Sequence, residues 1–293
     1  MGSRKMKPEW LTIRPPKKPL DEMKGILKSR KLHTVCEESH CPNMPVCWDN
    51  KTATFLIMGN TCTRHCRFCA VKSGKPKPLN MNEPEGIAKA AKEMGLEYAV
   101  ITSVDRDDLP DKGAAHFAEC IRMLKKGGIA VEALIPDYGE NELRKVASAC
   151  PDMIAHNLEV VERLQGSVRD KRAGYQESLN TLKCIKRLCS SQCTKSSLML
   201  GIGETKKEVI EAMEELGKAG VGLVTLGQYL APGKSFPKVE RYVTPEEFAE
   251  YKREGERMGL AVESGPFVRS SFNAKGMWLQ SKNREDARGK KCL

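Results

Sequence analysis

Six cysteines in two close groups are the residues of this chain best suited to chemistry. An upstream triplet has the spacing C-x4-C-x5-C, and a downstream triplet has the spacing C-x3-C-x2-C (Cys36, Cys41 and Cys47; Cys62, Cys66 and Cys69). Only 14 residues separate the triplets. Three thiolates at such spacing suit a 4Fe-4S cluster, because short loops can wrap one face of the cluster. Three ligands leave one iron free to bind a small molecule, so we interpret the downstream triplet as a reaction centre.

Zinc is the main alternative to iron at these thiols. Structural zinc sites prefer paired C-x2-C units that supply four ligands, whereas the downstream triplet has no fourth cysteine close by. His40 lies inside the upstream triplet and would complete a zinc site there with Cys36, Cys41 and Cys47. His65 lies inside the downstream triplet, where we interpret it as a spacer that points away.

More distant metal candidates are interpreted as structural. Cys184, Cys189 and Cys193 could imitate a third cluster site. The first two fall on or just past one expected helix, about 140° apart around its axis, which favours ordinary core and surface thiols. His156 ends an expected strand, and we expect it to pack there rather than bind metal.

Length and composition indicate a globular protein of a reducing compartment. The 293 residues suit one large α/β domain with additions or two ordinary domains, and an apolar share of 40% supports a sizeable core. No apolar run approaches the roughly 18 residues of a membrane helix. Met1 to Lys7 is charged with no apolar segment behind it, so we expect no secretion signal and a cytoplasmic location. Clustered cysteines in such a chain bind metal more often than they form disulfides.

The net charge of +11, from 49 basic and 38 acidic residues, fits three kinds of partner. These are nucleic acid, an anionic small molecule and an acidic protein, and the alternative is that the charge only keeps the chain in solution. Aromatic residues make up 5%, and no basic stripe is interleaved with them, which argues against nucleic acid. Nothing in the sequence indicates an oligomer, so we expect a monomer.

Alternating strands and helices must position the downstream triplet. The first expected strand, Thr52 to Met58, is apolar and β-branched and stops at Gly59, just before Cys62. Later strands are expected at Tyr98 to Thr102, Ala130 to Ile135, Met153 to His156, Ser197 to Leu200 and Leu223 to Leu226. Helices are expected after Pro84 and at Ala114 to Lys126, Glu140 to Ala149, Tyr175 to Leu188, Lys206 to Ala219 and Pro245 to Met258.

This alternation predicts βαβ units and a parallel sheet. About six units suit an incomplete barrel as well as an open sheet, and we take the fold class as α/β, a partial (β/α)6 TIM-type barrel with N-terminal and C-terminal extensions. Residues 1–50 are proline-rich and irregular, with one helical stretch at Asp21 to Ser29, and carry the upstream triplet. Residues 51–258 form the barrel. Residues 259–293 hold the motif Arg269-Ser270-Ser271-Phe272 and a basic tail that is expected to be solvated and disordered from Lys282 to Lys291.

The downstream triplet resembles the signature of a known superfamily. The stretch C-T-R-H-C-R-F-C, residues 62–69, is similar to the cluster loop of the radical S-adenosylmethionine (radical SAM) enzymes. The resemblance implies that the open iron chelates the amino and carboxylate groups of S-adenosylmethionine. An electron then cleaves a carbon–sulfur bond of the cofactor and produces a 5′-deoxyadenosyl radical.

The upstream triplet narrows the resemblance to one family. The stretch V-C-E-E-S-H-C-P-N-M-P-V-C-W, residues 35–48, resembles the auxiliary-cluster motif of the lipoyl synthase family. The similarity runs from about Trp10 to Asn273. Further similar blocks are ITSVDRDDLP (101–110), VEALIPD (131–137), HNLE (156–159), residues 194–205 and ESGPFVRSS (263–271).

The family resemblance implies further site residues. A serine of its R-S-S-Y motif is the fourth ligand of the auxiliary 4Fe-4S cluster, so Ser270 or Ser271 takes that role here; without the family, a turn is the better interpretation. Candidates for the S-adenosylmethionine pocket are Thr102, Ser103, Asp105, Asn157 and Glu159.

The chain also departs from the family pattern. Phe272 replaces the tyrosine, Asn273 replaces the usual histidine, Lys112 stands where glycine is common, and residues 231–236 differ from the usual P-T-x-x-H. These departures bear on substrate docking more than on cluster binding, because the six cysteines are all present.

The implied activity is the insertion of two sulfur atoms at carbons 6 and 8 of a protein-bound octanoyl group. The auxiliary cluster supplies the sulfur, and the downstream cluster generates the radical. The implied partners are an octanoylated lipoyl carrier domain or glycine-cleavage H protein, and an electron donor of the flavodoxin or ferredoxin type.

Two alternatives remain open at this point. One is a different radical SAM enzyme with an auxiliary cluster, and the other is a non-enzymatic metal-binding protein that docks acidic partners.

Overall fold

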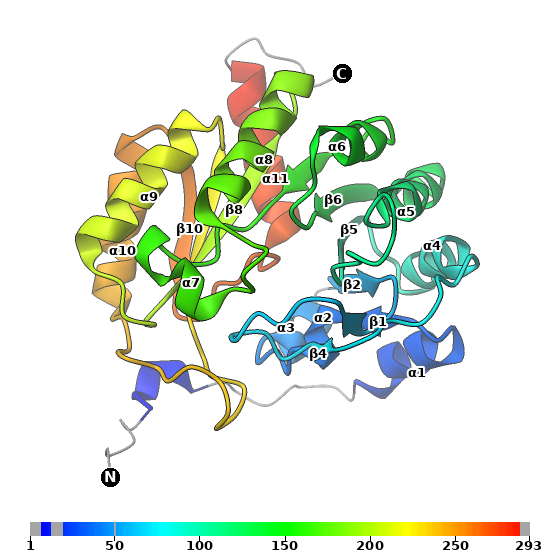
Figure 1. Cartoon of the computed structure of the whole chain (residues 1–293), viewed down its shortest axis with the longest axis horizontal. Coiled ribbons are helices and arrows are strands. Elements are labelled where there is room, and N and C mark those ends of the chain that lie inside the picture. The colour runs from blue at the N-terminus through cyan, green and yellow to red at the C-terminus, as the bar shows by residue number, and fades with distance from the viewer. Residues whose placement is uncertain (1–6, 13–19, 50, 288–293) are drawn as a thin grey trace.

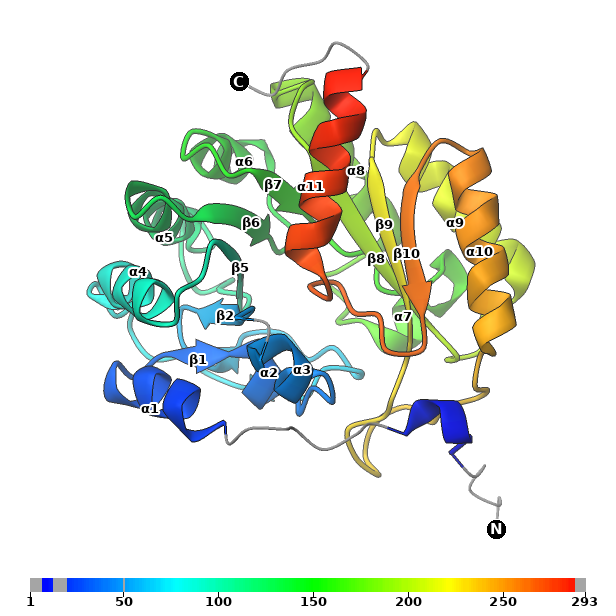
Figure 2. The same cartoon turned by 180° about the vertical axis from the view of Figure 1, so that it is seen from behind.

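The computed structural model describes residues 7–12, 20–49 and 51–287. Across these ranges one sheet has the strand order β1-β2-β5-β6-β7-β8-β9-β10 (Figures 1 and 2). β1 (His33–Thr34) pairs antiparallel with β2, and every later neighbouring pair is parallel. The parallel strands are β2 (Thr54–Ile57), β5 (Tyr98–Ser103), β6 (Ala130–Leu134), β7 (Met153–Ala155), β8 (Thr194–Leu200), β9 (Leu223–Gln228) and β10 (Ala261–Gly265). β1 and β10 stand at opposite ends of this order, so the barrel is incomplete.

Helices cover the outer face of the curved sheet, as Figure 1 shows for the succession from α4 to α10. The longer outer helices are α4 (Glu83–Glu93), α5 (Ala114–Lys126), α6 (Glu140–Ala147), α8 (Tyr175–Leu188), α9 (Lys206–Lys218) and α10 (Pro245–Arg257). The other helical segments are η1 (Glu9–Leu11), α1 (Asp21–Ser29), α2 (Val35–Glu38), α3 (Met44–Asp49), η2 (Glu162–Leu164) and α7 (Gln165–Val168). β3 (Thr61–Cys62) and β4 (Lys72–Ser73) pair outside the main sheet.

Alternation along the strands separates two faces of the sheet. In β5, Ala99 and Ile101 are fully buried in the core beneath the helices. Tyr98 and Val100 point to the other face and pack with Ala274 instead. Residues of one strand thus alternate between the helix-covered face and the interior of the barrel.

Helix α11 (Ala274–Ala287) packs on the amino end of the barrel (Figure 2). Its Trp278 contacts Tyr98 at the start of β5, with ring centroids 5.3 Å apart. Lys195 Nζ and Glu132 Oε1 form a fully buried ion pair at 2.5 Å, and the Tyr98 hydroxyl donates a hydrogen bond to Glu132. These groups occupy the interior at this end, which leaves the carboxyl ends of the strands for a ligand.

The expected fold class is confirmed, and all six expected strands are present. Two regions expected to lack structure contain helices. α2 and α3 lie within the first 50 residues, where Pro45 sits in the first turn of α3, a position that tolerates proline. Residues 282–287 of the expected disordered tail belong to α11, because Met277 and Trp278 anchor that helix in apolar clusters.

The remaining tail, residues 288–291, lies outside the described residues, as do residues 1–6. β10 was not expected and carries the sheet into the segment beyond residue 258. Where the structure describes the chain, no helix is both long enough and apolar enough to cross a bilayer.

Candidate active site

A cavity of about 550 Å³ opens at the carboxyl ends of the parallel strands. Residues at the ends of β2, β5, β6, β8 and β9 line it, among them Leu56, Ser103, Leu134, Met199 and Gly227. Ligands of parallel α/β folds bind at this edge, because the loops that follow each strand converge there. Both cysteine triplets reach this cavity.

The upstream triplet enters the cavity from α2, α3 and the turn between them. Thr34 caps α2 by accepting a hydrogen bond from the Glu37 amide, and Cys36 and Cys41 line the cavity. Cys47 does not line it, but the charges of Cys36 and Cys41 act on its thiol, so the three are neighbours.

In the downstream triplet, Cys62 ends β3, and Cys66 and Cys69 lie on the loop that leads to β4; all three line the cavity. Backbone amides point at two of the sulfur atoms. Cys62 Sγ accepts from Asp105 N at 3.3 Å and from Arg64 N at 3.4 Å, and Cys66 Sγ accepts from Asp170 N at 3.3 Å. Such donors stabilise a metal-bound thiolate.

Arg64 ties the downstream triplet to the barrel. Its side chain is 4% exposed and contacts three carboxylates: Asp105 at 3.3 Å, Asp107 at 3.0 Å and Asp137 at 2.5 Å. Burial opposes the charge of Arg64, but the hydrogen bonds to Asp107 and the charges of all three carboxylates outweigh burial and raise its pKa. The loop is therefore held by a permanent, buried cation.

Asp137 contacts three further residues in addition to Arg64. Its carboxylate lies 3.2 Å from His156 Nε2 and 3.4 Å from Arg169, and it accepts from the Ser178 hydroxyl. Burial alone would raise the pKa of Asp137, but His156, Arg169 and Arg64 hold it well below the usual range. His156 thus packs and bonds at its strand end, as the sequence predicted.

The residues expected to bind S-adenosylmethionine also meet at the cavity. Thr102, Ser103, Asp105, Asn157 and Glu159 all line it. The Asn157 amide donates to Glu159 at 3.0 Å. Burial raises the pKa of Glu159, although this hydrogen bond and the charge of Arg169 act in the opposite direction. Burial also raises the pKa of Asp105, although the charge of Arg64 opposes that rise.

The C-terminal motif reaches the same cavity from β10. Ser270 and Ser271 both line it, and the Ser270 hydroxyl donates to Asn157 Oδ1 at 2.8 Å. Arg269 lies close enough to Cys41 for their charges to interact, although burial is the larger effect and lowers the Arg269 pKa. The Asn43 amide donates to the Phe267 carbonyl, which joins this segment to the upstream triplet.

Neither triplet has the geometry of a single-ion site. Among the described residues, the one set of three His, Cys, Asp or Glu ligand atoms that lie within 4.8 Å of one another is Glu83, His116 and Cys120. Thiolates around a cube of irons bind different irons and lie farther apart than ligands of one ion. The set of Glu83, His116 and Cys120 belongs to neither triplet.

The other metal candidates have separate surroundings. Cys184 Sγ accepts from Arg187, Cys189 Sγ contacts Ser191, and Cys193 Sγ contacts Ser281. His40 lines the cavity, whereas exposed His65 contacts the Ser73 hydroxyl at 3.0 Å.

Sequence reasoning missed the roles of Arg64, Asp137 and Arg169. Arg64 stands at a spacer position of the cluster loop, and Asp137 ends one of the similar blocks noted above. The sequence shows these charged residues, but it does not show that they contact one another, because those contacts depend on the order of the loops around the barrel.

Comparison with known proteins defines first the class and then the family. The model of the Radical SAM superfamily matches residues 56–216, more than half of the chain. A lipoyl synthase of Caldanaerobacter subterraneus subsp. tengcongensis is 50% identical over 272 residues, covering 92% of this chain and 95% of the relative. A lipoyl synthase of Methanocella arvoryzae is 50% identical over 275 residues, covering 92% of this chain and 93% of the relative.

Solved structures agree at the level of the fold. Methylornithine synthase (PylB) has a TM-score of 0.54 at 12% identity, covering 84% of this chain and 78% of that one. The FeFe-hydrogenase maturase HydG from Carboxydothermus hydrogenoformans has a TM-score of 0.54 at 12% identity, covering 89% and 78%.

The chain belongs to the lipoyl synthase family within the radical SAM superfamily. The expected family, function as a lipoyl synthase and status as an enzyme are thereby confirmed. A 4Fe-4S cluster and S-adenosylmethionine are cofactors of this class.

The thiol pKa values predict how metal uptake depends on pH. Burial raises the pKa of Cys62 to about 12 and of Cys69 to about 11 in the metal-free chain. Metal must displace these protons, so affinity rises with pH, by up to ~10-fold per pH unit for each proton released. Titration with Co²⁺, followed by absorption between about pH 6.5 and 8.5, measures this slope. A pH-independent affinity would contradict the prediction, and a variant with the downstream triplet replaced by alanine is the control.

Proposed function

We propose that this chain inserts two sulfur atoms at carbons 6 and 8 of an octanoyl group attached to a carrier protein. The downstream triplet holds the 4Fe-4S cluster that binds S-adenosylmethionine, and the upstream triplet holds an auxiliary 4Fe-4S cluster with a serine. One observation carries the proposal: five of the six clustered cysteines, both serines and the expected cofactor residues line a single cavity, and the sixth, Cys47, neighbours Cys36 and Cys41.

The bound cofactors supply a carbon radical strong enough to remove hydrogen atoms from unactivated carbons, and sulfide to replace them. The protein positions the substrate and the cofactor and keeps water away from them. Apolar walls that include Leu56, Leu134 and Met199 suit an alkyl chain and exclude water. Thr102, Ser103, Asp105, Asn157 and Glu159 offer polar groups for the amino acid and ribose portions of S-adenosylmethionine.

Ser271 is the better choice for the fourth auxiliary ligand. The Ser270 hydroxyl is already bonded to Asn157, which in turn bonds Glu159. In this arrangement Ser271 binds iron, while Ser270 links the C-terminal motif to the cofactor pocket. Serine is a weak iron ligand, which suits a cluster that must give up its sulfur.

The segment layout follows from these roles. Residues 1–50 form an extension that presents the auxiliary cluster, residues 51–258 form the barrel that generates the radical, and residues 259–293 return the serine motif to the cavity. A monomer in a reducing cytoplasm suits such oxygen-sensitive clusters.

A basic segment beside the cavity suits an acidic carrier domain. Residues 64–82 contain no Asp or Glu, and Lys72, Lys75 and Lys77 are exposed next to Ser73, which lines the cavity. The carrier is an octanoylated lipoyl domain or glycine-cleavage H protein. The reductant is a flavodoxin or ferredoxin, which is also a small acidic protein.

Single cysteine replacements should separate the two clusters. Cys69→Ala should lower S-adenosylmethionine cleavage by at least ~100-fold, because losing a ligand costs more than losing a second-shell partner. Cys41→Ala should preserve cleavage but lower lipoyl product by at least ~100-fold. Quantifying 5′-deoxyadenosine and lipoyl product per chain tests both expectations. Equal loss of both products in each variant would indicate one shared site instead, and Cys150→Ala is a matched control at an exposed thiol.

The carrier proposal predicts salt-dependent association. The association rate with an octanoylated H protein should fall by about tenfold between low and high salt, because screening weakens steering. The double variant Lys75→Glu, Lys77→Glu should reduce both the rate and its salt dependence. Stopped-flow fluorescence measures both quantities, with the double variant Lys126→Glu, Lys218→Glu, at exposed positions in the last turns of α5 and α9, as a charge-matched control. A rate insensitive to salt and to the double variant would contradict steering by this segment.

A further inference from the structure

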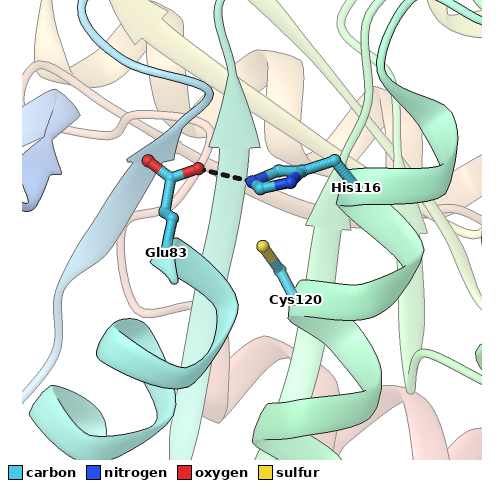
Figure 3. A group of neighbouring side chains, drawn as sticks. All are labelled: Glu83, His116 and Cys120. Carbon is cyan, nitrogen blue, oxygen red and sulfur yellow. Dashed lines mark hydrogen bonds and ion pairs between the residues drawn. The ribbon is translucent and has the colours of Figure 1, made fainter. Parts of the chain in front are cut away.

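A buried cluster of three polar side chains lies between the first two outer helices. Glu83 begins α4, while His116 and Cys120 lie one turn apart on α5, and Figure 3 shows all three side chains converging. His116 Nε2 lies 2.7 Å from Glu83 Oε2. Glu83 is 4% exposed, His116 is 6% exposed, and Cys120 is fully buried.

These three groups are residue types that bind metals, but the Glu83 carboxylate already accepts hydrogen bonds within the protein. Glu83 Oε2 also accepts a hydrogen bond from the Met58 backbone amide at 2.8 Å. The same oxygen therefore bonds both the His116 ring and the backbone at Met58, and a metal ion would not account for the bond to the backbone. A structural role for the carboxylate therefore explains the geometry better than a metal does.

Met58 is the residue at which the chain leaves the sheet for the cluster loop. It follows β2 directly, has a left-handed backbone with φ 66°, and precedes Gly59 with φ 88°. Non-glycine residues adopt this conformation only where surroundings enforce it. Cys62, the first ligand of the downstream triplet, follows four residues later.

The Met58 side chain is fixed as well as its backbone. A Cβ atom at Gly113 would meet Met58 Sδ at 2.1 Å, so the glycine before α5 leaves room for the thioether. His116, which bonds Glu83, lies in the first turn of the same helix. Elements α4 and α5 thus hold one backbone turn from two sides.

We propose that Glu83 and His116 are positioning residues for the radical-generating cluster. Glu83 holds the Met58 amide in the left-handed turn, and His116 orients the carboxylate. The turn sets where Cys62 enters the cavity. The link to cofactor chemistry rests on the function proposed above, whereas the local clamp does not.

Hydrogen exchange tests the clamp without cofactor. In Glu83→Ala, the exchange of the Met58 amide should accelerate by about tenfold or more relative to wild type, because a buried donor loses its acceptor. Glu83→Gln, which keeps an acceptor oxygen, should restore most of the protection. Cys120→Ala is the matched control, since it opens the same buried space but leaves the bond to Met58. Equal acceleration in β8 and β9 would show general loosening and overturn the clamp.

Cofactor cleavage tests the consequence. After correction for iron content, Glu83→Ala should cleave S-adenosylmethionine about tenfold more slowly than Cys120→Ala. The reason is that a displaced turn at Met58 would displace Cys62 and the cluster that it helps to hold. If Glu83→Ala and Cys120→Ala cleave S-adenosylmethionine at the same rate although the Met58 amide exchanges faster in Glu83→Ala, the positioning role is wrong. The proposed function would not be affected by that result. Stoichiometric zinc in the wild type that is lost in Cys120→Ala would establish a metal site and overturn the proposal.

Discussion

One buried guanidinium constrains the site. Arg64 lies within the cysteine loop, yet its contacts are Asp105 and Asp107 after β5 and Asp137 after β6. A charge removed from water must stay paired, because breaking such a pair costs ~3–5 kcal/mol. The loop cannot shift without separating the buried Arg64 guanidinium from these half-buried carboxylates, so the position of the downstream triplet is fixed relative to two strand ends.

The position proposed for the auxiliary cluster is built from segments far apart in the chain. Asn43 bonds the Phe267 carbonyl, and Ser270 bonds Asn157, so the N-terminal extension, the barrel and the C-terminal motif meet at one cavity. β10 makes this possible, because it ends at Gly265 and directs the following residues across the carboxyl edge of the sheet. The proposed function, in which a substrate radical formed beside one cluster reacts at the other, needs this proximity.

The sequence predicted the strands and helices that have strong hydrophobic patterns. The spacing of the cysteines singled out six residues, five of which line the cavity, and their role as cluster ligands stays a prediction. The apolar run at Thr52 to Met58 is β2, and the helices at Ala114 to Lys126 and Tyr175 to Leu188 match α5 and α8. α11 was missed because its apolar residues are few and it is stabilised by packing on the barrel. Arg64 and Glu83 were missed because a single charged residue carries no periodic signal, and its partners come from loops that only the fold brings together.

In the proposed function, each triplet holds its own cluster beside one cavity. Iron and acid-labile sulfide analysis of anaerobically purified protein tests it most directly. The account predicts about eight irons and about eight sulfides per chain in the wild type, and about four of each when either triplet is replaced by alanine. One or two zinc ions without visible absorption would contradict the account, as would the loss of all iron on removing either triplet alone.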